Sequence, residues 1–283
     1  MTSTRCLSFL TLPAFILSLN LFLSCNRRHE MPGEEITEHN MSLYLDESGQ
    51  LYNSSFDNWC RIDKVWYAFG AEADEGQRIW DSGNNGTITM GENNVVEEKD
   101  FLAVPGQGKS AARLQTRFVG VLGIGRLAAG SLFTGRFLRT IGTSGAELSW
   151  GLPYCYRPVS LGGYYCYKTR SIDRTDKAHK YLKGEPDTAT IQVVLADWEG
   201  PFTINNAKDI KVDPENDPCI IGHALLEIAG NMDEYVAFDL PIEYRDERQP
   251  RYLVIAASSS KYGDYFTGGT GATLWIDEFS LKY

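Results

Sequence analysis

Histidine is scarce in this sequence, with 4 copies in 283 residues. Neither an H-E-x-x-H zinc motif nor a G-x-S-x-G nucleophile motif occurs, and His179 and His223 stand apart from each other. A hydrolase built on a Ser-His-Asp triad is therefore not expected. Lysine and arginine form no long run, and the formal net charge is −10 at pH 7. A negative chain repels phosphate groups, so nucleic acid is not expected as a partner.

The six cysteines form no C-x-x-C pair, which leaves zinc and thioredoxin motifs without their spacing. Cys155 and Cys166 flank a turn-like stretch and could pair across a hairpin, because an oxidising envelope permits disulfides. Free buried thiols explain the pattern equally well. The sequence leaves both readings open for Cys60, Cys155, Cys166 and Cys219.

Residues 1–25 have the layout of a secretory signal. One positive charge, Arg5, precedes an apolar run that ends at Ser24-Cys25, and this ending resembles a lipobox. We expect Cys25 to be acylated, which predicts a protein lipid-anchored in the outer membrane, on its periplasmic or its surface side. The bulky Phe22 and Leu23 favour a bacteroidete lipobox. An uncleaved membrane anchor and a buried apolar helix are the alternatives.

Residues 26–54 are polar and acidic and are expected to form a flexible tether. Residues 55–283 then read as one domain, because no second linker or internal repeat follows. Short β-branched or alternating segments between Gly, Pro, Asn and Asp clusters predict an all-β antiparallel sandwich or barrel. The strongest of these are 189–196, 235–240, 251–257 and 272–277, whereas 220–229 fits a helix or a strand.

Aromatic residues make up 12% of the chain, and carbohydrate ligands stack on exposed aromatic rings beside amide and carboxylate partners. Trp80-Asp81-Ser82-Gly83-Asn84 supplies a ring and polar groups in one loop-like segment. We expect a carbohydrate-binding site formed by Trp80, Asp81, Asn84 and Asp264. The alternative is that these rings fill the core, as aromatics commonly do.

Glycoside hydrolysis normally needs two facing carboxylates. The candidates near strand ends are Asp81, Asp197, Glu199 and Asp264, but spacing along the sequence selects no pair, so no catalytic residue is assigned. Asp57 near the start of the domain and Asp277 near its end are candidate ligands of a structural Ca²⁺, a hard cation that prefers oxygen ligands. A pair of surface carboxylates is the alternative.

Several blocks resemble one known family. Residues 252–279 carry a hydrophobic strand, Ser258-Ser259-Ser260 and Gly263-Asp264 before a late acidic strand. This order is similar to the end of the "putative carbohydrate metabolism domain" family of bacteroidete lipoproteins. Ala272 and Glu278 replace a serine and an aspartate of that pattern, and the second change weakens the metal prediction. Residues 80–84, 128–135 and 162–167 resemble upstream blocks in the same order.

The resemblance covers about residues 50–283 and implies a jelly-roll-like antiparallel β-sandwich with a carbohydrate-related role in glycan utilisation. It carries over no catalytic residues. Three hypotheses follow, of which the first is a lipoprotein that binds a glycan without cleaving it. The second is a glycoside hydrolase that uses a pair of acidic residues. The third is a structural or adhesive envelope protein that uses the sandwich as a scaffold.

Overall fold

The computed structural model describes residues 41–104, 108–121, 124–142 and 144–283. The predicted signal sequence and Cys25, the predicted acylation site, lie outside these ranges. Among the described residues, no helix combines the length and the apolar character needed to cross a bilayer.

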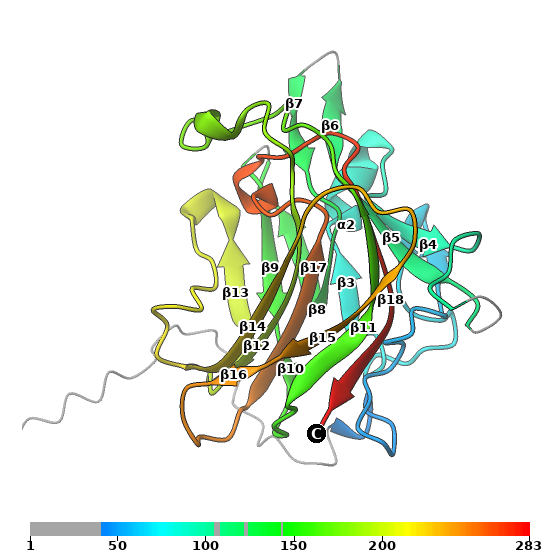
Figure 1. The fold of residues 1–283 in the computed structure, drawn as a ribbon, viewed down its shortest axis with the longest axis vertical. Helices are drawn as coiled ribbons and strands as arrows, with labels where there is room; N and C mark the ends of the chain where they lie inside the picture. The colour runs from blue at the N-terminus through cyan, green and yellow to red at the C-terminus, as the bar shows by residue number, and fades with distance from the viewer. Residues whose placement is uncertain (1–40, 105–107, 122–123, 143) are drawn as a thin grey trace, which may run out of the picture.

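The larger of two main sheets has nine strands, and every pairing in it is antiparallel. Figure 1 shows its central strands side by side. Seven strands follow the order β13 (Phe202–Asn205), β9 (Ala146–Trp150), β8 (Ser131–Thr140), β17 (Tyr252–Ser258), β12 (Ala189–Ala196), β14 (Ile220–Ile228) and β16 (Glu243–Tyr244), while β10 (Leu152–Pro153) pairs with β17 and β3 (Trp80–Ser82) with β8.

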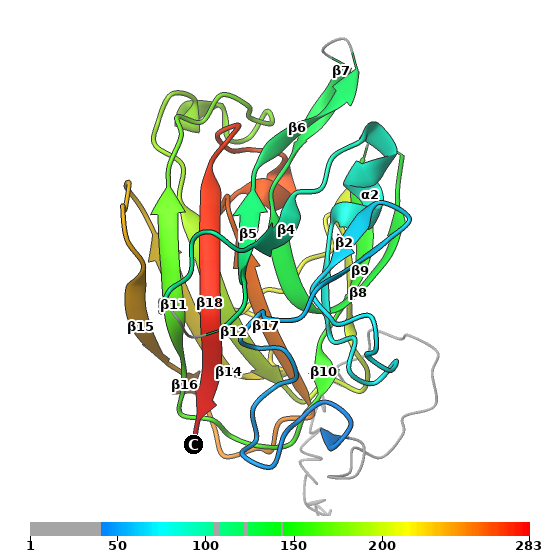
Figure 2. The same ribbon diagram turned by 90° about the vertical axis from the view of Figure 1, so that its right-hand side faces the viewer.

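The smaller main sheet has five strands and faces the viewer in Figure 2. Its order is β15 (Val236–Pro241), β11 (Ser160–Lys168), β18 (Thr273–Lys282), β5 (Ala111–Gln115) and β4 (Val95–Glu98). Two sheets packed face to face bury the inward side chains of both, so the prediction of an antiparallel jelly-roll-like β-sandwich is confirmed.

Two hairpins and five short helical turns complete the described chain. The hairpins are β1 (Cys60–Ile62) with β2 (Val65–Tyr67), and β6 (Arg117–Val121) with β7 (Ile124–Ala128), which projects beyond the sheets in Figure 2. The turns are α2 (Asn84–Thr87), η1 (Ile88–Met90), η2 (Lys180–Leu182), η3 (Asn206–Lys208) and η4 (Gly263–Tyr265).

The larger sheet is buried on both faces in its middle, and β17 shows why. Its alternate residues Leu253 and Ile255 lie in the core between the sheets, whereas Tyr252 and Val254 join a second apolar cluster on the outer face. Because successive side chains of a strand point to opposite faces, a continuous apolar run is what such a strand requires. The segment 220–229, which fitted a helix or a strand, forms strand β14.

The predicted tether extends too far toward the domain. Met41, Tyr44 and Leu51 are buried in the core between the sheets, with 1%, 7% and 4% of their surfaces exposed. Residues 41–54 therefore belong to the folded unit, because their few apolar side chains fill space under the sandwich. The acidic, polar composition of this segment gave no sign in the sequence that Met41, Tyr44 and Leu51 are buried. Cys60 and Cys166 are free thiols, so the hairpin disulfide between Cys155 and Cys166 is absent.

Candidate functional site

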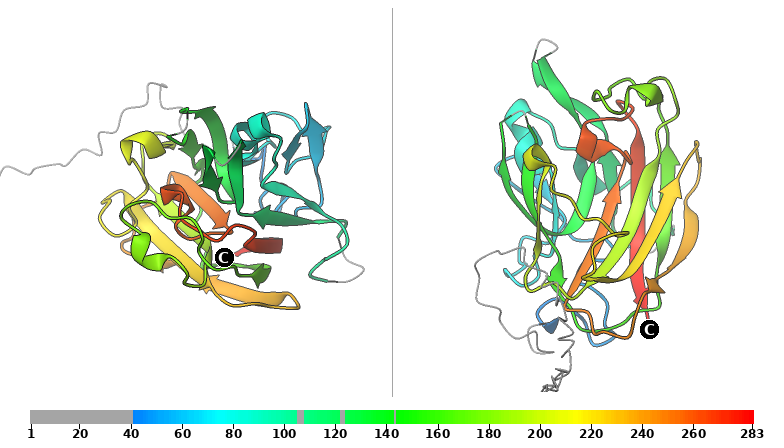
Figure 3. Two further views of the ribbon diagram at one scale, coloured as in Figure 1. Left: turned by 90° about the horizontal axis from the view of Figure 1, so that it is seen from above. Right: turned by 90° about the vertical axis from the view of Figure 1, so that its left-hand side faces the viewer.

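A hollow with a volume of about 690 Å³ opens on the outer face of the larger sheet. Its floor is formed by β8, β9, β12 and β17, and its walls by α2, the β6–β7 hairpin, η3 and η4. Seen from above in Figure 3 (left), α2 in cyan, η3 in yellow and η4 in orange-red stand around the green strands β8 and β9. A hollow of this volume falls within the range of small-molecule sites.

Aromatic and apolar side chains form the floor of the hollow. Phe133 and Phe137 lie four residues apart on β8 and face the same side of the sheet, with Gly135 between them. Gly135 has a φ of 146°, and a Cβ there would clash with the carbonyl oxygen of Ser149, so β8 needs glycine where it passes close to β9. Trp150 of β9 packs beside Phe133, with ring centroids 5.8 Å apart. Phe137 is half-buried and presents ring surface to the hollow.

Polar groups line the rest of the hollow. Thr190 and Gln192 point outward from β12, and Asn206, Lys261 and Asp264 reach it from the surrounding turns. Asp264 is the one carboxylate among the described residues that line this hollow. Amide, hydroxyl and carboxylate groups over an apolar floor suit a ligand with both polar and C–H surfaces.

Asp264 is an exposed residue that lines the hollow, and many protein atoms nevertheless surround its carboxyl group. This burial raises the pKa of Asp264, although the nearby charge of Lys211 and a hydrogen bond donated by the Asn206 amide act in the opposite direction. An accessible carboxyl with a perturbed pKa in a concave site marks a functional candidate. Of the four predicted carbohydrate-binding residues, Asp264 is the one that lines the hollow.

Trp80 does not form part of an exposed site, and that prediction is wrong. Its side chain is 1% exposed in the core between the sheets, where it packs edge-on against Phe56 and Phe279. Its indole N–H donates to the carbonyl of Tyr52 at 3.0 Å. The polar residues after Trp80 suggested a rim position, but β3 pairs with β8 and directs this ring inward.

Asn84 is also structural, because its side chain is 1% exposed and its hydrogen-bonding groups are already used. The amide donates to the carbonyls of Trp66 and Val95, and the oxygen accepts from the backbone N–H groups of Asn94 and Val95. No group is left for a sugar hydroxyl, so the prediction of Asn84 as a ligand contact is wrong.

Asp81 supports the hollow from the side of β3 and is not among its lining residues. Its Oδ2 accepts from the backbone N–H of Phe137 at 2.7 Å, and its Oδ1 from that of Ser82 at 2.7 Å. Burial raises the pKa of Asp81 to about 6, against the lowering effect of these bonds and of Arg136. Asp81 therefore acts on Phe137 through the backbone, and its predicted contact with carbohydrate is not supported by this position.

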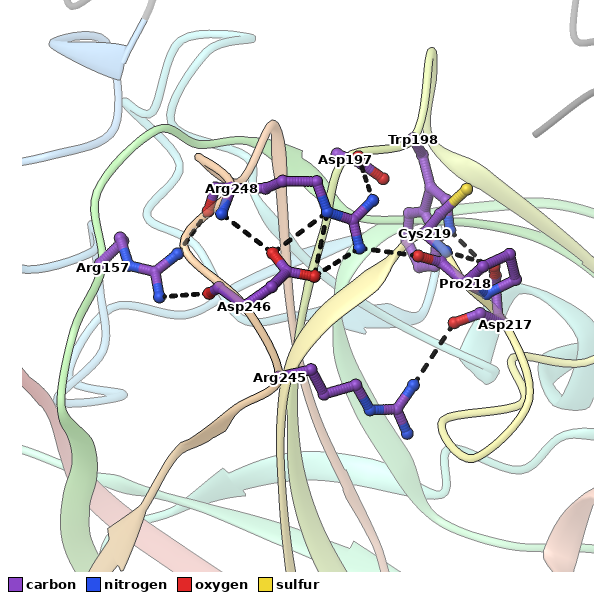
Figure 4. Close-up of polar contacts among 9 residues, drawn as sticks. All are labelled: Arg157, Asp197, Trp198, Asp217, Pro218, Cys219, Arg245, Asp246 and Arg248. Atoms are coloured by element: carbon purple, nitrogen blue, oxygen red, sulfur yellow. Dashed lines mark hydrogen bonds and ion pairs between the residues drawn. The ribbon is translucent and has the colours of Figure 1, made fainter. Parts of the chain in front are cut away.

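Asp197 directly follows the end of β12, roughly 16 Å along the strand direction from Gln192, and Glu199 lies in the loop beyond it. Asp197 Oδ2 accepts from Arg248 at 2.6 Å, and Arg248 also binds Asp246 at 2.8 Å (Figure 4). This ion cluster ties the β16–β17 loop to the end of β12. The structure thus separates Asp197 and Glu199 from Asp264, and no hydrolytic pair joins them.

Asp57 and Asp277, the predicted metal ligands, lie near each other and near Glu278. Asp277 is 3% exposed, and burial raises its pKa to about 7, with Glu278 and Asp57 adding repulsion. Its Oδ2 accepts from the backbone N–H of Ala103 at 3.0 Å, whereas its Oδ1 is buried without a partner. Within the described ranges, however, no group of three or more His, Cys, Asp or Glu side chains is arranged to hold a metal ion. The metal site stays a prediction.

Phe133, Phe137 and Trp150 were not singled out from the sequence, although a signal was present. Alternation along Phe133-Thr134-Gly135-Arg136-Phe137 puts both rings on one face, and a glycine inside a strand is typical of a close approach by another backbone. The sequence could not show that this face looks away from the smaller sheet, because that depends on pairings with β3, β9 and β17.

Comparisons with known proteins agree with this fold. A crystal structure of a "putative glycoside hydrolase" from Bacteroides thetaiotaomicron has a TM-score of 0.61 and 24% identity, covering 81% of this chain and 70% of that one. A second crystal structure of a "putative glycoside hydrolase", from Bacteroides vulgatus, has a TM-score of 0.59 and 23% identity, and the match covers 81% of this chain and 96% of that one. Likeness at these identities shows a shared fold. Among curated proteins there is no match. Residues 55–282 match the family described as "putative carbohydrate metabolism domain", and the chain belongs to that family.

Proposed function

We propose that this protein binds a glycan in the hollow on the outer face of its larger sheet. The family is carbohydrate-related, and the hollow pairs an accessible aromatic ring, Phe137, with an accessible carboxyl, Asp264. That pairing is the observation that carries the proposal. A sugar ring would lie with its C–H face on Phe137, while Gln192, Asn206 and Asp264 receive its hydroxyl groups.

Titration calorimetry with a panel of plant and host glycans tests this proposal. Phe137→Ala removes the half-buried ring, and Phe238→Ala removes a half-buried phenylalanine on β15 of the other sheet as a matched control. We expect Phe137→Ala to weaken binding about tenfold or more and Phe238→Ala to leave it unchanged. Equal effects of the two substitutions, or no binding by the wild type, would overturn the proposal.

Glycoside hydrolysis is a second candidate, because Asp264 places in the hollow a carboxyl group with a raised pKa, the kind of group that serves as a general acid. Release of reducing ends from any bound glycan, abolished by Asp264→Asn, would support it. Binding without such release would leave the first proposal in place and exclude the second for that glycan.

We also propose that the protein is lipid-anchored in the cell envelope through Cys25 and serves a glycan-utilisation system. The apolar leader and its ending at Ser24-Cys25 support this. Fractionation of expressing cells should place the wild type with membranes and Cys25→Ala in the soluble fraction. Equal membrane association of both would contradict the lipid anchor.

A further inference from the structure

Three tyrosines gather around one histidine beside the hollow. The ring centroid of His179 lies 4.5 Å from that of Tyr265, 5.1 Å from Tyr262 and 6.2 Å from Tyr181. These four residues are called the tyrosine cluster below. Tyr181 is 71% exposed and Tyr265 is 37% exposed, so the cluster presents aromatic surface to solvent instead of burying it in a core.

The tyrosine cluster is continuous with the hollow. Asp264, which lines the hollow, stands between Tyr262 and Tyr265 in the turn η4. Lys211 connects the tyrosine cluster with the hollow. Its Nζ lies 3.3 Å from the ring centroid of Tyr265, and its charge acts on the carboxyl group of Asp264. Figure 1 shows η2 in bright green and η4 in orange-red at the same end of the molecule.

Hydrogen bonds hold the tyrosine cluster in place before any ligand arrives. His179 Nδ1 lies 2.7 Å from Oδ1 of Asp176, whose backbone N–H donates to Thr267 Oγ1 at 3.0 Å. Arg174 and Gly268 exchange two backbone hydrogen bonds, 3.3 and 3.0 Å long. The loop that carries His179 and Tyr181 is thus fastened to the loop that follows η4. A surface fixed in this way loses little conformational entropy when it binds.

We propose that the tyrosine cluster is a second carbohydrate subsite, which receives the sugar residues that continue from a glycan held in the hollow. The inference rests on the proposed function of the hollow and names its ligand class as an oligosaccharide. Tyrosine suits this task because its ring offers an apolar face and its hydroxyl a polar edge. Since Tyr181 and Tyr265 lie beyond Asp264, a ligand that fills only the hollow does not reach them.

Titration calorimetry with oligosaccharide ladders tests the subsite. The probes are cello-, xylo-, manno- and galacto-oligosaccharides of one to six residues. Tyr181→Ala and Tyr265→Ala are compared with Tyr164→Ala, a tyrosine substitution on β11 of the other sheet. Wild-type affinity should rise with chain length. We expect each cluster variant to lose roughly 3- to 10-fold in affinity for the longest ligand and to keep wild-type affinity for the shortest one bound. Tyr164→Ala should follow the wild type throughout.

The outcomes separate this inference from the proposed function. Two results would contradict glycan binding in the hollow and therefore also the subsite. One is that the wild type binds none of the probes or other glycans, and the other is that Phe137→Ala binds as well as the wild type. If Phe137→Ala loses binding while both cluster variants match the wild type at every length, only the subsite is wrong. Affinity that does not change with chain length would also overturn the subsite. Circular dichroism melts establish that the variants are folded.

Discussion

The backbone N–H of Phe137 donates a hydrogen bond to Oδ2 of Asp81 at 2.7 Å. This bond joins β3 to β8 at the point where the Phe137 ring faces the hollow. Asp81, which was predicted to contact the ligand, therefore fixes the backbone of Phe137, the residue whose ring we propose as the ligand contact.

Asp81 should make stability depend on pH. Burial raises its pKa to about 6 from the ordinary 3.8, so between these values the native state holds a proton that the unfolded chain releases. The stability contributed by this proton is present below pH 3.8 and is lost as the pH rises through 6. Urea unfolding between pH 4 and 7 should show a smaller decline in Asp81→Asn than in the wild type. Parallel curves would contradict the raised pKa.

Trp80 should matter for stability and not for binding. Trp80→Ala removes a buried indole and its hydrogen bond to Tyr52, which is expected to lower the free energy of unfolding by about 3–5 kcal/mol. Trp80→Phe should lower it less and leave glycan affinity at the wild-type value. Chemical denaturation and calorimetry measure the two quantities. A folded Trp80→Phe protein that binds no glycan would restore Trp80 to the site.

Asp264 should make glycan binding depend on pH. If Asp264 contacts the glycan as proposed, its ionised carboxylate accepts hydrogen bonds from sugar hydroxyls, and burial raises its pKa. Affinity should therefore fall as the pH is lowered through this raised pKa, while Asp264→Asn binds more weakly and without that dependence. Asp239→Asn, on β15 of the other sheet, serves as the control. Titrations between pH 4 and 8 would refute the assignment if the wild type and Asp264→Asn showed the same profile.

Calcium provides the test of the predicted metal site. If Asp57 and Asp277 hold Ca²⁺, the ion should raise the melting temperature of the wild type at pH 8, above the raised pKa of Asp277. A ligand that binds only the native state stabilises it in this way. Asp277→Asn should abolish the shift. A wild-type melting temperature that changes neither across a calcium titration nor with EDTA would contradict a Ca²⁺ site at Asp57 and Asp277.

Much of the sandwich could be predicted from the sequence, because strand patterns are local. The segment 189–196 matches β12 at both ends, and 251–257 lies one residue from β17. The candidate site was harder to predict from the sequence, because its position depends on which strands pair. Asp264 follows a clear strand and lines the hollow, and its contact with carbohydrate stays a prediction. Trp80 was misplaced because only its pairing with Thr134 shows that its ring faces the core.

Hydroxyl-radical footprinting tests the location of the glycan most directly, and Met90 is the natural reporter. Its side chain is 52% exposed and lines the hollow, whereas Tyr283 is 54% exposed and does not line it. With a saturating glycan found by titration, we predict that oxidation of Met90 falls several-fold and that of Tyr283 stays constant. Unchanged oxidation of Met90 and Phe137 under saturating ligand would contradict binding in the hollow.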